Sequence, residues 1–171
     1  MKLQLVGQVA RVKMKKQKQV CSEAKNDDFK KIQTFLAEDS PLVTSLLARI
    51  LSKDERVIIA GSVADGWKAL CYASTLQPDL VIVGLHLPGL DGEGLVRRLK
   101  LQQNPPIIFV VTSDDSPESR ARCLTVGADG FLLKTKDLPA RLHAAVQSFW
   151  PRRSAISQPS AGFRKTSHRR A

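Results

Sequence analysis

Short apolar runs alternate with amphipathic stretches along the middle of the chain, and this rhythm is its strongest structural signal. The runs are three to six residues long, rich in valine and isoleucine, and mostly continuous in their apolar character rather than alternating. Such runs are typical of parallel strands that are covered on both faces of a sheet. They lie at Ile32–Ala37, Val57–Gly61, Leu80–Val83, Ile107–Val111 and Phe131–Leu133.

Five helical patterns follow these runs. Ser40 before Pro41 is typical of a helix start, because a capping hydroxyl precedes a proline in the first turn, and Ser116 before Pro117 repeats the signal. Pro151 predicts the end of the last helix. The patterns begin at Pro41, span Asp65–Leu76, centre on Leu95–Leu99, run from Ser116 to Gly127, and span Leu138–Phe149. Five strand–helix units predict an α/β fold with an open, doubly wound, five-stranded parallel sheet and right-handed crossovers.

Length and composition fit one globular domain with extensions. The chain has 171 residues, 43% hydrophobic and 25% charged, which suffices for one domain of roughly 100–150 residues. No apolar run approaches the roughly 20 residues of a membrane span, and the first residues lack a secretory pattern. We therefore expect a cytoplasmic protein with a domain at 30–150 and two disordered basic extensions, at 1–29 and 151–171.

The net charge of +11 belongs to the two ends of the chain. Residues 1–31 carry nine basic and three acidic side chains, residues 151–171 carry six basic and no acidic ones, and the middle has a net charge of −1. Basic ends can neutralise the phosphates of nucleic acids or the headgroups of an anionic membrane. They are also typical of disordered extensions that only increase solubility, so both interpretations stay open.

The three cysteines, Cys21, Cys71 and Cys123, are widely spaced and form no CxxC pair. This spacing indicates neither a disulfide framework nor a structural zinc site. Cys71 and Cys123 lie within apolar helical stretches, so we expect both to be small buried residues.

Polar side chains follow several of the predicted strands, where ligands bind in open α/β sheets. Glu38 and Asp39 follow the first strand and Lys134 follows the fifth, while Thr112 ends the fourth strand and Gly84 ends the third. Carboxylate, hydroxyl and ammonium groups are costly to bury apart, so we expect them to share one pocket.

Five segments of the chain resemble the receiver domains of response regulators, in the correct order over about 120 residues. The amino-acid sequence of these segments is most similar to receivers that precede helix-turn-helix output domains. The resemblance implies the flavodoxin-like (βα)5 receiver fold. The segments are FLAEDSPLV, ADGWKAL, PDLVIVGLHLPGLDG, PIIFVVTSDD and GADGFLLK.

The resemblance implies a role for each pocket residue. Glu38 and Asp39 match the acidic pair that holds Mg²⁺, and Lys134 matches the lysine that contacts the phosphoryl oxygen. Thr112 and Phe131 match the switch pair, a hydroxyl and an aromatic whose positions change together on activation. Gly84 stands where the family has its phosphorylated aspartate, and there the pattern breaks.

Without that aspartate, the chain lacks the carboxylate nucleophile of phosphorelay and one of three Mg²⁺ ligands. We therefore expect no cofactor, with Mg²⁺ bound weakly if at all. We also expect Lys134 to pair directly with Glu38 or Asp39, holding the pocket in one state.

Neighbouring residues offer poor replacements for the missing carboxylate. Asp91 more readily caps the third helix, and Asp79 lies at the opposite end of its strand. His86 with Glu38 and Asp39 makes a conceivable transition-metal site, although an exposed loop histidine is the simpler interpretation. The hydroxyls of Thr112 and Ser113 are conceivable phosphoacceptors for another kinase.

Three functions follow, of which the first is favoured. It is a pseudo-receiver that acts by protein–protein interaction with a sensor kinase, another response regulator or an output protein, and that can form a homodimer through the face of the fourth helix, fifth strand and fifth helix. The alternative is binding of nucleic acid or an anionic surface by the basic ends. An enzyme is the least favoured, because the sequence indicates no substrate-sized polar pocket.

Overall fold

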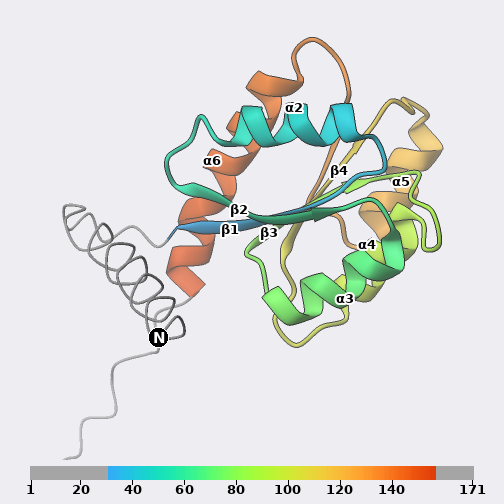
Figure 1. Ribbon diagram of the computed structural model, residues 1–171, viewed down its shortest axis with the longest axis horizontal. Helices are drawn as coiled ribbons and strands as arrows, with labels where there is room; N and C mark the ends of the chain where they lie inside the picture. The colour runs from blue at the N-terminus through green and yellow to red at the C-terminus, as the bar shows by residue number, and fades with distance from the viewer. Residues whose placement is uncertain (1–30, 157–171) are drawn as a thin grey trace, which may run out of the picture. The chain divides into compact units, whose positions relative to one another are not determined.

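A single parallel sheet forms the centre of the domain (Figure 1). The computed structural model describes residues 31–156, so the expectation for residues 1–29 lies outside them. The five predicted strands are confirmed, with ends that differ by at most two residues. They are β1 (Ile32–Ala37), β2 (Val57–Val63), β3 (Leu80–Gly84), β4 (Ile107–Thr112) and β5 (Gly130–Leu133), in the spatial order β2-β1-β3-β4-β5.

The helices begin where the sequence places their capping residues. Ser40, Asp65, Asp91 and Ser116 each accept a hydrogen bond from a backbone N–H in the first turn of the helix that follows, which satisfies a donor that the helix itself leaves free. The helices are α2 (Pro41–Leu51), α3 (Gly66–Leu76), α4 (Gly92–Lys100), α5 (Pro117–Thr125) and α6 (Leu138–Ile156).

Helices cover both faces of the sheet (Figure 1): α2 and α6 lie on one side, and α3, α4 and α5 on the other. The central strand β3 is buried along its whole length. Its alternate residues belong to different cores, since Val81 packs with the α3–α5 layer and Ile82 with the α2–α6 layer. This double burial explains the continuous apolar runs of the sequence.

Two sequence-based expectations are wrong. Cys71 is exposed on α3, whereas Cys123 is buried as expected; an apolar stretch identifies a helix but does not say which of its faces meets the core. The last helix does not stop before Pro151, because α6 continues to Ile156. Proline removes one N–H donor from the helix, and that loss does not end the helix here. The last helix therefore includes the first residues of the expected basic tail.

No helix within residues 31–156 is both long and apolar enough to cross a membrane.

Candidate functional site

The carboxyl ends of four neighbouring strands bring the predicted pocket residues together. Glu38 follows β1, Gly84 ends β3, Thr112 ends β4 and Lys134 follows β5, and these strands are adjacent in the sheet. The Lys134 N–H donates to the Thr112 carbonyl at 2.8 Å, which extends the pairing of β4 and β5 into the site. The parallel topology therefore gathers residues that are up to 96 positions apart.

A buried ion pair occupies the centre of the pocket. The Lys134 ammonium donates to both carboxylate oxygens of Glu38, at 2.9 and 3.0 Å. The Glu38 side chain is only 1% exposed and that of Lys134 is 21% exposed. A carboxylate this deeply buried requires a cation or several hydrogen-bond donors, and the Ser40 N–H adds a third contact at 3.3 Å. The expected ion pair is thus present, and its acid is Glu38.

The carboxylate of Glu38 lies in the space in front of Gly84. A Cβ atom added at Gly84 would be 2.6 Å from Glu38 Oε2 and 3.4 Å from the Ala37 carbonyl oxygen. The first distance is too short for any side chain unless Glu38 moves. The space beside the strand end is therefore filled from β1, by the carboxylate that also holds Lys134.

The residues present do not fit a magnesium site. Asp39 is exposed and lines, with Glu38, an open pocket of about 320 Å³ at the ends of β1 and β2. In the described part of the chain, no three His, Cys, Asp or Glu side chains gather into a group that could hold a metal ion. Mg²⁺ needs oxygen ligands that are free to face it, whereas both Glu38 oxygens face Lys134.

Thr112 is held by the loop that follows β4. The residue is only 1% exposed, and its hydroxyl oxygen accepts the Asp114 N–H at 3.1 Å. The loop is itself braced, because the Asp114 carboxylate accepts the Ser119 hydroxyl at 2.5 Å and the Ser116 N–H at 2.9 Å. These hydrogen bonds stabilise the charged form and lower the pKa of Asp114 to about 2.

A chain of polar contacts continues from this loop to α4. Arg122 donates to the Ser119 hydroxyl at 3.0 Å and to Glu93 at 3.3 Å, and Glu93 also pairs with Arg97. Sequence analysis missed these residues. The aspartate two residues before the Ser116 cap was the available signal, since such residues fold the backbone into a turn.

Phe131, the other predicted switch residue, is directed into the protein. It is 5% exposed and packs in the core of the α3–α5 layer. The Arg120 guanidinium lies 6.0 Å from the centre of its ring, at the outer limit of a cation–π contact.

The alternative site residues do not join the pocket's ion pair. Asp91 caps α4, where it accepts the Gly94 N–H at 2.8 Å. His86 and Ser113 are exposed, and Thr112 is buried.

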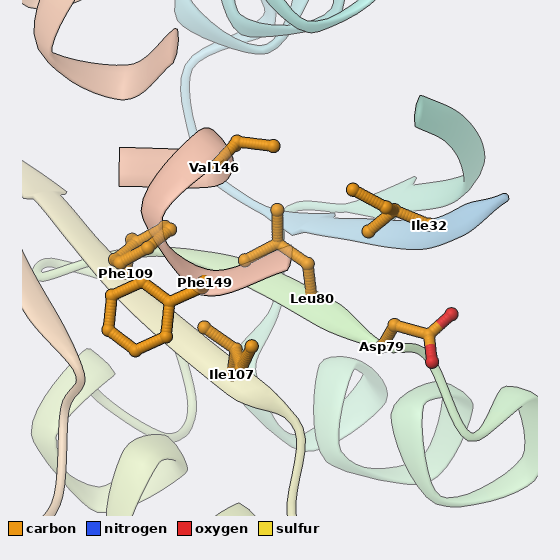
Figure 2. A pocket seen from close by; sticks show the side chains of 7 residues that line it. All are labelled: Ile32, Asp79, Leu80, Ile107, Phe109, Val146 and Phe149. Carbon is orange, nitrogen blue, oxygen red and sulfur yellow. The ribbon is translucent and has the colours of Figure 1, made fainter. Parts of the chain in front are cut away.

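A second hollow lies at the opposite end of the strands, between α6 and the sheet (Figure 2). Apolar side chains from β1, β3, β4 and α6 line it, and Phe109 and Phe149 meet there edge to face. Its carboxylate, Asp79, accepts the Gln33 N–H at 3.0 Å. This hollow is a small gap in the packing of the α2–α6 core, and it is separate from the polar pocket.

Comparison with known proteins assigns the family. Residues 34–147 match the model of the response regulator receiver domain. The chain is 29% identical over 134 residues to the positive alginate biosynthesis regulatory protein of Pseudomonas aeruginosa, covering 76% of this chain and 53% of that protein. It is 34% identical over 103 residues to protein-glutamate methylesterase/protein-glutamine glutaminase 2 of Anaeromyxobacter dehalogenans, covering 60% of this chain and 30% of that protein. The chain thus spans about half or less of these relatives.

Solved structures agree with this assignment. The signal receiver domain of the response regulator designated NarL from Mycobacterium tuberculosis superposes with a TM-score of 0.67 and 26% identity, covering 71% of this chain and 98% of that domain. The isolated REC domain of RcsB from Salmonella enterica serovar Typhimurium, at 24% identity, TM-score 0.63 and coverage of 69% and 89%, shows the same fold.

The chain belongs to the receiver-domain family of response regulators. Receiver domains are modules of two-component signalling that interact with kinases and other proteins.

Proposed function

We propose that this chain is a pseudo-receiver, a cytoplasmic signalling module that acts through protein contacts without aspartyl phosphorylation. The observation that carries the proposal is the pair of Glu38 and Lys134 in front of Gly84. Glycine has no group that can attack a phosphoryl donor, and formation of an aspartyl phosphate requires a carboxylate nucleophile. The cation that would receive a phosphoryl oxygen already has an anionic partner within the protein.

The surroundings of the pair support a pocket with one resting state. The hydroxyl of Thr112 accepts a hydrogen bond from the Asp114 backbone, and Asp114 is tied to the start of α5 by Ser116 and Ser119. In a receiver domain that is phosphorylated, the phosphoryl group offers new contacts, and these stabilise a different conformation of the loop after the fourth strand. Here no phosphoryl group forms, so the module works as a fixed binding surface.

We assign the binding surface to the face of α5, β5 and α6, which corresponds to the fourth helix, fifth strand and fifth helix of the sequence pattern. Leu124 on α5 is 42% exposed, and Arg120 lies on the same helix over Phe131. Arginine is enriched in protein interfaces, and the exposed leucine beside it adds apolar area to such a contact. A sensor kinase, an intact response regulator, an output protein or a second copy of the chain is the class of partner.

Incubation with a small acyl phosphate and Mg²⁺ tests the proposal. We expect the intact mass of the protein to stay unchanged, because position 84 offers no nucleophile. An intact receiver domain in the same reaction is the positive control, and it gains about 80 Da per phosphoryl group. A stable adduct of that mass on this chain would contradict the proposal, and peptide mapping would then locate the unexpected acceptor.

The distribution of charge supports a second function, the binding of nucleic acid or an anionic surface by the basic ends. Residues 1–31 and 151–171 each carry a net charge of +6. We expect binding to duplex DNA or to anionic vesicles to weaken steeply as salt is added, because the affinity comes from released counterions. A chain that lacks residues 1–28 and 157–171 should lose most of this binding. If it binds as well as the full chain, the basic ends are not responsible.

A further inference from the structure

The outer edge of β2 is an open edge of the sheet. Within residues 31–156, β2 pairs with β1 on one side and with no strand on the other. Val57 donates its N–H to the Asp54 carbonyl, but from Ile58 onward the outward-facing backbone groups form no hydrogen bond in the described chain. Such a row of free donors and acceptors is a template for another strand.

The sequence of this edge lacks the usual protection. Proteins commonly prevent edge pairing with lysine or other charged side chains, with proline, or with a bulge. The strand reads VIIAGSV, without a charge or a proline, and its one protective feature is a register irregularity at Ala60 opposite the step from Thr34 to Phe35. Ile58 is 40% exposed, so a large apolar side chain is uncovered beside this edge.

An apolar flank runs beside this edge on α3. Ser74 and Trp67 lie on the side of α3 that faces α4, since Gln102 donates to the Ser74 hydroxyl and Arg98 stacks on Trp67. Tyr72 and Leu76, one turn apart, lie on the other side.

This second side of α3 faces the sheet edge. The Tyr72 ring lies 6.5 Å from that of Phe35 in β1, and Phe35 pairs with Gly61 of β2. Tyr72 is 54% and Leu76 45% exposed. Together with Ile58 they form what we call the β2–α3 patch, a set of three large apolar side chains beside free backbone groups.

Towards the end of β2, the other face of the edge is open as well. Ser62 of β2 and Ser45 of α2 bound the open pocket there, whereas Val57 and Ile59 pack in the α2–α6 core. The two serine side chains are small, so they leave room for a neighbouring strand to approach.

We propose that the β2–α3 patch is a homodimer interface, in which β2 of one copy pairs antiparallel with β2 of a second copy about a twofold axis. A strand without charge needs no counter-charge, so an identical strand is a matched partner. The twofold axis places both α3 helices on the same side of the joined sheet, where Tyr72 and Leu76 of each copy face the other copy. The contact is self-complementary, as a twofold interface must be.

Sedimentation velocity of the full chain over a range of micromolar concentrations tests this interface. We expect a dimer whose dissociation constant rises at least about tenfold in Ile58→Lys, because a lysine on the edge strand is brought toward its symmetry mate. Tyr72→Lys should act in the same direction without altering the strand. Amide hydrogen exchange in Val57–Val63 should slow as the concentration of the wild-type chain increases.

Two control variants separate this surface from others. Leu101→Lys changes an 81% exposed residue at the end of α4 and should leave the dimer intact. Leu124→Lys changes the α5 surface that we assigned to protein contacts, so it tests whether the chain dimerises there instead. Circular dichroism confirms that every variant is folded. A wild-type chain that stays monomeric throughout would overturn the proposal. A dimer that Leu124→Lys weakens and Ile58→Lys does not would also overturn it.

Discussion

Gly84→Asp is expected to turn this chain into a protein that accepts a phosphoryl group. The substitution places a carboxylate nucleophile at the carboxyl end of β3, in the same row of strand ends as Thr112 and Lys134. Glu38 has to move, because its Oε2 would lie 2.6 Å from the new Cβ. It is the end of a flexible side chain, so it can move without a shift of the backbone, and the new aspartate can then compete for Lys134.

Restoring the carboxylate also adds an oxygen ligand for Mg²⁺. The introduced aspartate, Asp39 and a displaced Glu38 would offer three carboxylates at one end of the sheet, and hard oxygen ligands set the affinity for this ion. Intact mass after incubation with an acyl phosphate and Mg²⁺ should show an added mass of about 80 Da. The adduct should disappear when Mg²⁺ is omitted.

Gly84→Asn is the matched control, since it has the shape of aspartate without the nucleophile. It should displace Glu38 in the same way and gain no mass. If Gly84→Asp is folded and also gains no mass, the missing aspartate at position 84 does not by itself explain the absence of phosphorylation. The cause would then lie in the hydrogen-bonded β4–α5 loop or in the position of Lys134.

Lys134→Met is expected to destabilise the domain by about 3 kcal/mol, the lower part of the range for breaking a buried ion pair. Methionine keeps most of the length of the apolar stem but leaves the Glu38 carboxylate, 1% exposed, without a cation. The lower part of the range applies because the Lys134 side chain is 21% exposed and water can reach that end of the pair. Urea unfolding followed by circular dichroism measures the change.

The double variant Glu38→Gln with Lys134→Met shows whether the cost comes from the unpaired charge. It removes both charges, so it should recover much of the lost free energy of unfolding. Lys136→Met, at an exposed position two residues away, should change stability by no more than about 0.5 kcal/mol. If Lys134→Met behaved like Lys136→Met, the ion pair would contribute nothing to the fold.

The elements of this fold were predictable because their signals are local. A continuous run such as Leu80–Val83 is buried on both faces, and the structure extends it by one residue to Gly84. Ser40 and Asp91 act as helix caps, as the polar residue before each apolar pattern indicates. The strand order β2-β1-β3-β4-β5 is the flavodoxin-like order, which the resemblance to receiver domains implied.

Other features depended on contacts that no local pattern describes. Cys71 lies in an apolar stretch but on an exposed side of α3, because the packing of α4 and the sheet decides which side of α3 is covered. The last helix, α6, passes Pro151 and reaches Ile156, whereas a proline by itself predicts an end. Trp67 is 49% exposed, and the Arg98 guanidinium of the neighbouring helix lies 5.0 Å from the centre of its ring.

The sheet and its helices can be predicted from the sequence alone, as can the glycine at the end of the third strand. The sequence also predicts that a lysine and two acids lie near that glycine, since parallel strands end at the same edge. Three features become visible only in the folded domain: Glu38 is the partner of Lys134, its carboxylate lies in front of Gly84, and Asp39 is left exposed. The choice between two adjacent acids depends on distances across neighbouring strands, and those distances exist only once the sheet is assembled.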